Sequence, residues 1–439
     1  MKKDKILYLL ILINILNTII LILGKRFYPI KWILLIFNVL IVIFCDAEKI
    51  LPTIFFLHPN SALYDDIGFL HIFNICVVIG AIRLLVKNNF KVDKKTVLLL
   101  ALLISWELMA IFRTGLVDTS ILSLVSWGSS YLVLIIIEKE NLNFEQIYKY
   151  FFFGFIMAFL CGIVNPIIRW GISGIPTAYR FTGLLRDPNY YSVDALLLIF
   201  SAKTYAKANN KSALLYQSII FILGAFSVSK MFILMVVLGG ILNLIYSLKK
   251  VSIIKGIIGS IIMIGIITLS IKSGYLEILL NKYAYRTETT SAFTGRDYLL
   301  SYYISKVVSD PVTMLLGNST LKYSKVLTQG ISNEYFQNFV AHNTYLDIIL
   351  SWGVLGAGIY ILLISSILRN AKIYHKKDNI IKNNDFLVGT IVFIITISSL
   401  SYLATDFFAL AIAYLIILKY SNCSTNEKKE EERECAIGK

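Results

Sequence analysis

The chain has 439 residues, of which 57% are hydrophobic and 16% are charged. Apolar runs repeat along its whole length, and a run of about 18 or more apolar residues crosses a bilayer as a helix because unpaired backbone groups are costly in hydrocarbon. This composition excludes a globular protein with a single anchor and predicts an all-α, polytopic integral membrane protein.

The formal net charge of +15 raises the question of nucleic acid as a partner. The lysines and arginines lie in short turns between apolar runs rather than on one face, so we expect no nucleic acid. Cytoplasmic turns that follow the positive-inside bias and attract anionic membrane lipids explain the charge better. We also predict no disulfide and no metal site, because no CxxC pair and no His/Cys spacing occurs among Cys45, Cys76, Cys161, Cys423 and Cys435.

The first apolar run, 6–24, follows Lys2, Lys3 and Lys5 and has the basic start of a signal peptide. No small-residue cleavage site follows it, so we interpret it as the first membrane helix. Further apolar runs predict helices at 31–45, 67–86, 96–113, 119–137, 150–170, 191–206, 213–228, 231–248, 252–271, 344–368, 386–400 and 402–419. Residues 50–58 are expected to form a half-helix or a re-entrant piece, which gives about 12–14 transmembrane helices.

The orientation in the membrane follows from four strongly basic turns, which we interpret as cytoplasmic: 87–95, 203–211, 249–255 and 369–382. Counting the crossings between these turns places 171–190, 227–230 and 272–342 on the external side. The same count leaves the amino-terminal lysines outside, against the positive-inside bias, unless residues 50–58 complete another crossing. We favour that extra crossing.

We divide the chain into three parts on this basis. Residues 1–149 form the N-terminal transmembrane helices, and 150–420 form a membrane domain that includes the external loop 272–342. Residues 421–439 form a cytoplasmic tail with a run of charges from Glu427 to Glu434, which we expect to be solvated.

The first external cluster of polar residues runs from Arg180 to Asn189 and also contains Gly183 and Arg186. Pro188 and Asn189 mark a helix start. Arg180 and Arg186 would then lie at a positive helix amino terminus, which is a natural site for an anion. The alternative is an interfacial turn whose arginines bind lipid phosphate.

Two further external clusters carry cations. Lys230 follows Ser229 in the tight turn 227–230, where a lysine is often only a snorkelling anchor. The loop 272–342 contains Thr294-Gly295-Arg296 and many tyrosines. Aromatic rings beside cations suit sugar faces and phosphates, but they equally suit a membrane interface.

His342 and Asn343 lie where this loop re-enters an apolar helix. An imidazole titrates near neutrality and suits a general base, while a hydrogen-bonding role in positioning is the milder alternative. We expect the other histidines, His58, His71 and His375, to be structural. We expect no catalytic role for the intramembrane carboxylates Glu107, Asp194 and Asp406, although Asp194 could join the site and Glu107 could pair with Arg113.

Four short motifs, in this order, resemble those of the O-antigen ligase and Wzy-type polysaccharide polymerase family: Arg180-x-x-Gly183 with Pro188-Asn189, then Ser229-Lys230, then Thr294-Gly295-Arg296, and last His342-Asn343 followed after nine residues by Gly353-x-x-Gly356. Family members tend to carry Ser-Arg at the second motif, and the lysine here keeps the charge but loses the bidentate fork. The resemblance covers roughly residues 150–420, whereas the first 150 residues match only as apolar helices.

The resemblance implies a GT-C-type, metal-independent glycosyltransferase that uses undecaprenyl-diphosphate-linked sugars outside the bacterial cytoplasmic membrane and needs no cofactor. It implies that cations hold the diphosphate, that a histidine activates or orients the acceptor hydroxyl, and that neighbouring residues shape the pocket. Carried onto this chain, the cations are Arg180, Arg296 and Lys230, the histidine is His342, and the neighbours are Gly183, Arg186, Asn189 and Asn343.

We therefore expect a polymerase that joins lipid-linked oligosaccharide repeat units into a capsular, O-antigen or exopolysaccharide chain. Flippase and chain-length regulator proteins are the partners that the family implies. A ligase that moves a finished glycan to another acceptor is an alternative that the motifs do not separate. A non-enzymatic lipid-linked-oligosaccharide flippase or other transporter is a third, and it predicts charged residues spread at mid-membrane depth.

Overall fold

The computed structural model describes residues 4–23, 28–64, 72–89, 91–115, 117–137, 143–164, 181–185, 187–247, 296–320, 326–327, 340–374, 384–401, 403 and 405–420. Within these ranges every regular element is a helix and no strand occurs, which confirms the all-α prediction. Three helices are long and apolar enough to cross a membrane, namely Lys94–Thr114, Phe144–Ile163 and Thr344–Tyr374. Other apolar helices are shorter, and the total of about 12–14 crossings stays a prediction.

The helices follow the apolar runs of the sequence. The first third of the chain contains α1 (Lys5–Leu23), α2 (Tyr28–Phe44), α3 (Ala47–Leu57), the 3-10 helix η2 (His58–Tyr64), α4 (Ile72–Lys87), α5 (Lys94–Thr114) and α6 (Val117–Ile137). The middle contains α7 (Phe144–Val164), α9 (Pro188–Ala208), α10 (Ala213–Ala225) and α11 (Lys230–Ser247). The last third contains α14 (Arg296–Ser309), α15 (Pro311–Leu316), α17 (Thr344–Tyr374), α18 (Asn384–Ile397) and α19 (Asp406–Tyr420). The helix expected at 252–271 and the tail at 421–439 lie outside the described residues.

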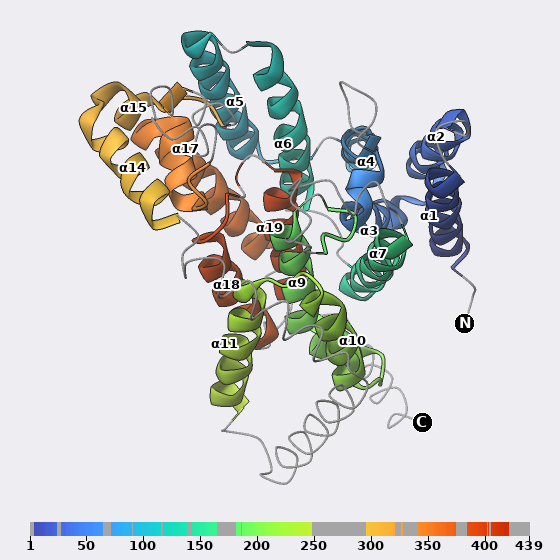
Figure 1. The fold of residues 1–439 in the computed structure, drawn as a ribbon. Coiled ribbons are helices and arrows are strands. Elements are labelled where there is room, and N and C mark those ends of the chain that lie inside the picture. The colour runs from blue at the N-terminus through green and yellow to red at the C-terminus, as the bar shows by residue number, and fades with distance from the viewer. Residues whose placement is uncertain are drawn as a thin grey trace, which may run out of the picture.

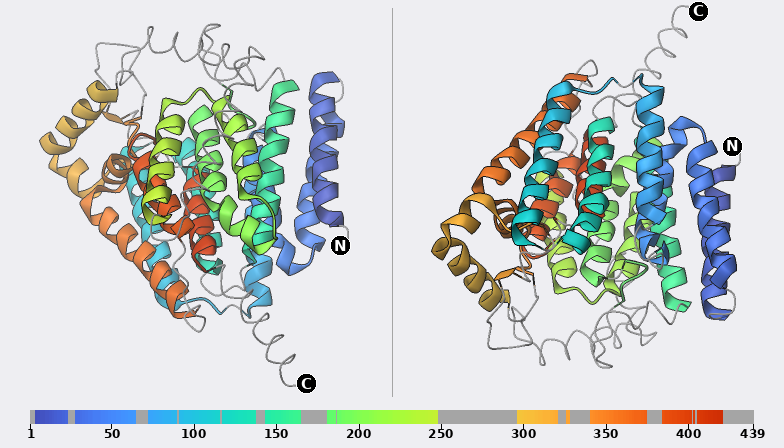
Figure 2. Two further views of the ribbon diagram at one scale, coloured as in Figure 1. Left: turned by 90° about the horizontal axis from the view of Figure 1, so that it is seen from below. Right: turned by 90° about the horizontal axis from the view of Figure 1, so that it is seen from above.

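The helices lie side by side in a bundle, with α1 and α2 at one edge and α14 and α15 at the opposite edge (Figures 1 and 2). Helices α9 and α19 occupy the middle, and almost every described side chain of α19 is buried. A helix that is apolar on all sides belongs in a core. By contrast, α1 and α2 expose large apolar side chains such as Leu12, Ile19 and Ile33, as expected for helices that face lipid.

Aromatic contacts show that α7 and α9 run antiparallel. Tyr148, near the start of α7, stacks on Tyr205 near the end of α9 with ring centroids 4.4 Å apart. Phe155, further along α7, stacks on Tyr191 at the start of α9 at 4.6 Å. The start of α7 and the start of α9 therefore lie at opposite ends of the bundle.

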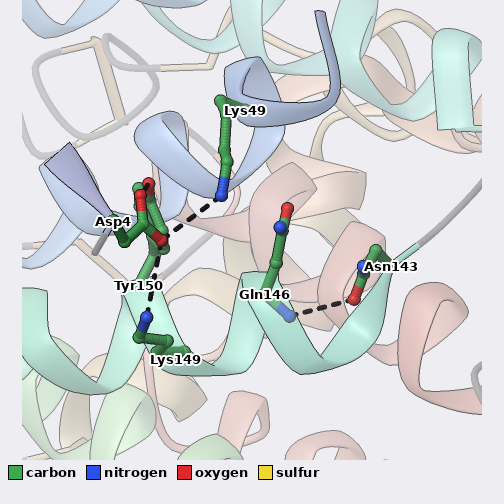
Figure 3. A network of polar contacts seen from close by, with 6 residues as sticks. All are labelled: Asp4, Lys49, Asn143, Gln146, Lys149 and Tyr150. Atoms are coloured by element: carbon green, nitrogen blue, oxygen red, sulfur yellow. Dashed lines mark hydrogen bonds and ion pairs between the residues drawn. The ribbon is translucent and has the colours of Figure 1, made fainter. Parts of the chain in front are cut away.

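One end of the bundle, which we call the Asp4 end, is held by a polar network around Asp4 (Figure 3). The Asp4 carboxylate accepts Lys49 Nζ at 3.3 Å, Lys149 Nζ at 3.4 Å and the Tyr150 hydroxyl at 2.8 Å. Partial burial opposes the charge of Asp4, but the Tyr150 hydrogen bond and the two lysines outweigh it and lower the pKa of the carboxyl. The network joins the chain's amino-terminal end to the starts of α3 and α7.

This network bears on the extra crossing expected at 50–58. Two predicted crossings separate the basic turn 87–95 from the start of α7, so the count places both on the cytoplasmic side. Asp4 contacts the start of α7 and therefore lies on that side as well. From Lys49, α3 and η2 then lead to His58, which contacts Asp194 about two turns from the start of α9. This path agrees in direction with the favoured interpretation of 50–58, and the extra crossing itself stays a prediction.

Helix α17 is broken at Gly353, whose φ of 65° and ψ of −176° are not helical. A side chain there would overlap the Leu315 carbonyl, so both the conformation and the space require glycine. The break frees carbonyl groups, and each finds a donor: Leu350 O accepts Asn318 N–H at 2.8 Å, Ser351 O accepts Ser319 N–H at 2.9 Å, and Trp352 O accepts Trp106 Nε1–H at 2.9 Å. Irregular backbone within a membrane bundle is stable only when its polar groups are paired in this way.

Candidate functional site

The candidate site lies at the opposite end of the bundle, which we call the Ser401 end because Ser401 joins three elements there. Ser401 lies between α18 and α19. Its hydroxyl oxygen accepts the backbone N–H of His342 at 2.9 Å and donates to Asp347 Oδ1 at 3.1 Å. Its carbonyl accepts the Tyr190 hydroxyl at 2.7 Å. The starts of α9 and α17 are therefore held together across this turn.

His342 and Asn343 lead into α17. Asn343 Oδ1 accepts the Leu346 N–H at 3.0 Å, so Asn343 is the N-cap of the helix. Thr344 Oγ1 donates to the Leu400 carbonyl at 2.6 Å and ties the first turn to the end of α18. His342 is half-buried and has a left-handed backbone with φ of 52°, which is unusual for a residue with a side chain. This capping role accounts for an asparagine at position 343 without any contact to a substrate.

The start of α9 brings the second external cluster to the same place. Asn189 Oδ1 accepts the Ser229 hydroxyl at 3.3 Å, and Ser192 Oγ donates to Ser227 Oγ at 2.9 Å. The turn 227–230 therefore packs on the first turn and a half of α9. Asn189 contacts Ser229, and the next residue, Tyr190, is hydrogen-bonded to Ser401, which in turn contacts His342. The Ser229-Lys230 and His342-Asn343 motifs are therefore connected through these two adjacent residues of α9.

The amino terminus of α9 carries a carboxylate of the protein, and the anion site expected there from Arg180 and Arg186 stays a prediction. Asp187 is its N-cap, and Asp187 Oδ1 accepts the Asn189 N–H at 2.6 Å. A carboxylate of the protein therefore already occupies the positive end of this helix. Arg180 and Arg186 lie outside the described residues.

Lys230 is the first residue of α11 and is half-buried. Within the described part of the chain, its ammonium group makes no hydrogen bond or ion pair. A lysine at a helix amino terminus adds to the positive field of the helix dipole instead of balancing it. The position is therefore suited to a bound anion such as a phosphate.

Gly183 has a structural explanation as well as its predicted role. Its φ of 59° favours glycine, and a side chain there would approach the Tyr191 ring to 2.6 Å. Its own carbonyl lies against Gly162 of α7. Gly183 therefore lets the segment before α9 pack closely between α7 and α9.

Arg296 is described only as the first residue of α14. The next turn of that helix packs on the His342 region, because Leu299 and Tyr303 share a buried cluster with Ala341 and Leu350. Tyr303 is fully buried, and burial together with the charges of Tyr302 and Asp347 raises the pKa of its phenol. Helix α14, which Arg296 begins, therefore packs beside the segment that leads into His342.

Sequence reasoning missed Ser401, Tyr190 and Asp347, which connect the motifs. It also missed the role of Glu107. Glu107 does not pair with Arg113 but accepts four hydrogen bonds of 2.8–2.9 Å, from Ser319 Oγ, Thr320 N, Thr320 Oγ1 and Trp352 Nε1. These bonds fasten the segment after α15 to α5 and to the break in α17.

Asp194 pairs with a histidine that was expected to be structural. His58 Nε2 lies 3.0 Å from Asp194 Oδ1, and both residues are almost fully buried. Among the described residues, neither His58 Nδ1 nor Asp194 Oδ2 has a hydrogen-bond partner. The Phe407 ring lies 4.5 Å from His58 and 5.6 Å from Tyr190, so this pair lies directly beneath the Ser401 end.

Known proteins add no assignment to this geometry. No protein-family profile matches the chain, and no curated protein is similar to it. The site itself offers the ammonium group of Lys230, which has no partner among the described residues, a half-buried histidine at a strained backbone position, and a chain of hydrogen bonds that links the two residues. The linking contacts run from Ser229 through Asn189, Tyr190 and Ser401 to the backbone of His342.

Proposed function

We propose that the protein is a glycosyltransferase of the outer face of the bacterial cytoplasmic membrane. In this proposal it polymerises oligosaccharide repeat units that are carried on undecaprenyl diphosphate. The product is a surface polysaccharide such as a capsule, an O-antigen or an exopolysaccharide. The observation that carries the proposal is the meeting of Lys230, Asn189 and His342 at the Ser401 end, through the contacts of Ser229, Tyr190 and Ser401.

The chemistry needs few groups. A lipid diphosphate is already a good leaving group, and fixed cations stabilise the charge that develops on it. Lys230, with Arg180 and Arg296 from the two remaining motifs, would hold the diphosphate. His342 would accept the proton of the acceptor hydroxyl, or orient that hydroxyl, as the bond to the sugar carbon forms and the bond to the diphosphate breaks.

A second candidate, transport of the lipid-linked oligosaccharide, is favoured by one observation. The buried His58–Asp194 pair is an ionisable couple within the bundle, and such pairs are common on transport paths. A ligase remains compatible with the same site, and it differs from the polymerase only in the acceptor that enters.

The test uses purified protein in proteoliposomes with an undecaprenyl-diphosphate-linked repeat unit, with the products separated on a gel. We expect a ladder from the wild type. His342→Ala should slow chain growth by on the order of 10²–10³, by analogy with the loss of one stabilising donor in an active site. His342→Ala acting like the wild type at matched protein levels would contradict the proposal. Movement of intact donor across the bilayer without any bond formation would favour the transporter.

A further inference from the structure

We infer that Ser401 and Asp347 form a positioning pair that fixes the backbone of His342 and thereby aims its imidazole. This inference rests on the proposed function, in which His342 meets the acceptor hydroxyl. Neither residue belongs to the motifs that the sequence singles out. The argument starts from the backbone of His342.

The backbone of His342 has to be held in place. Its φ of 52° lies in the left-handed region, which residues with side chains rarely adopt. On one side Ala341 is anchored in the buried cluster with Leu299 and Tyr303. On the other side Asn343 caps α17. Between these two anchors, the N–H of His342 is bonded to Ser401 Oγ, so the direction of the His342 side chain depends on this contact.

Asp347 determines how Ser401 is oriented. A serine hydroxyl has a single hydrogen, and here it is donated to Asp347 Oδ1. The oxygen lone pairs are then directed at the His342 N–H. Asp347 is buried in the first turn of α17, four residues after the N-cap, so the carboxylate is carried by the helix that directly follows His342 and Asn343. Without this acceptor the hydroxyl could rotate away from His342.

The carbonyl of Ser401 is held independently. Tyr190 donates to it at 2.7 Å from the first turn of α9, next to Asn189. Ser401 therefore couples the position of α9, which contacts Ser229 through Asn189, to the backbone of His342. A misplacement of about 1 Å at a reacting group can lower a rate by about 10²-fold.

The test compares Ser401→Ala, Asp347→Ala and the double variant in the proteoliposome assay, with the rate expressed per folded molecule from size-exclusion profiles in detergent. We expect each single variant to lower kcat by roughly 10- to 100-fold while the KM for the lipid-linked donor changes by less than about twofold. The double variant should lose no more than the worse single variant, because both substitutions remove the same constraint. Ser401→Thr keeps the hydroxyl and should recover most of the rate.

Ser399→Ala is the matched control, since among the described residues Ser399 Oγ donates only to the Thr396 carbonyl of its own helix end, at 3.0 Å. Wild-type kcat in Ser401→Ala, while His342→Ala is inactive, would overturn the positioning role and leave the proposed function intact. Equal losses in Ser401→Thr and Ser401→Ala would also overturn it. A normal ladder from His342→Ala would instead remove the proposed function itself.

Discussion

The two ends of the bundle are held together by different chemistry. At the Asp4 end, one carboxylate accepts two lysines and a tyrosine, so the cations are partly neutralised by the protein. At the Ser401 end, hydroxyl, amide and backbone groups and the Asp347 carboxylate make the connections between elements, and Lys230 has no anionic partner among the described residues. Since a paired lysine is less available to a substrate phosphate, the comparison predicts structural lysines at the Asp4 end and, under the proposed function, a substrate-binding lysine at the Ser401 end.

The largest expected effect comes from replacing the glycine at the non-helical position of α17, the helix that begins at the Ser401 end. Gly353→Ala places a methyl group on the Leu315 carbonyl and forces φ of 65° on alanine. Because this position cannot relax without moving α15, we expect little or no folded protein. The measurement is the yield of monodisperse protein after extraction in mild detergent.

Gly358→Ala is the control for this prediction. It lies in the same helix, and a Cβ there meets no atom within 4 Å. Alanine is also the better helix former, by about 1 kcal/mol. Gly358→Ala should therefore fold as well as the wild type, and equal yields from both variants would show that the break at Gly353 is not required.

The next effect separates the two kinds of lysine. Lys230→Met should lower the rate of chain growth by on the order of 10²–10³, because it removes a cation that is proposed to hold the diphosphate. The melting temperature should change little, because the ammonium group makes no contact among the described residues. Lys49→Met removes an ion pair with Asp4 and should leave activity per folded molecule unchanged. Parallel rate and thermal-shift measurements check both. Equal effects of the two variants on the rate would contradict the division into structural lysines at the Asp4 end and a substrate-binding lysine at the Ser401 end.

The smallest effect concerns the pH dependence of stability at the Asp4 end. The pKa of Asp4 is lower in the folded state than its ordinary value of 3.8, so its contribution is present above that value and is lost as the pH falls through the folded pKa. Asp4→Asn should therefore melt at a slightly lower temperature than the wild type at neutral pH. The two curves should converge in acid. Parallel curves with a constant offset would show that Asp4 does not titrate as the pairing requires.

The sequence predicted the helices well because long apolar runs determine membrane helices by themselves. It also predicted that His342, Asn189 and Lys230 share one end of the bundle, since the crossing count depends only on where basic turns lie. The roles of single polar residues were less accessible. Ser401 is an ordinary serine in a short turn, and it contacts residues 54 to 211 positions away.

The carboxylates illustrate the same limit. Proximity in the sequence suggests Arg113 as the partner of Glu107, whereas the partners in the structure are 212 to 245 residues away. His58 and Asp194 are separated by 136 residues and meet only because α3 and η2 lead to the middle of the bundle. The Asp187 cap, by contrast, was available from the sequence, because an aspartate before a proline is a common helix start. The anion site that the neighbouring arginines predict is compatible with this cap and stays a prediction.

The most direct test of the central claim is the accessibility of Lys230→Cys, His342→Cys and Lys149→Cys to a membrane-impermeant maleimide in intact cells, in a background without native cysteines. We predict that positions 230 and 342 are both labelled, and that position 149 is labelled only after the membrane is permeabilised. If 230 and 342 reacted from opposite sides, or if 149 and 342 reacted from the same side, the Ser401 end could not be a single external reaction centre.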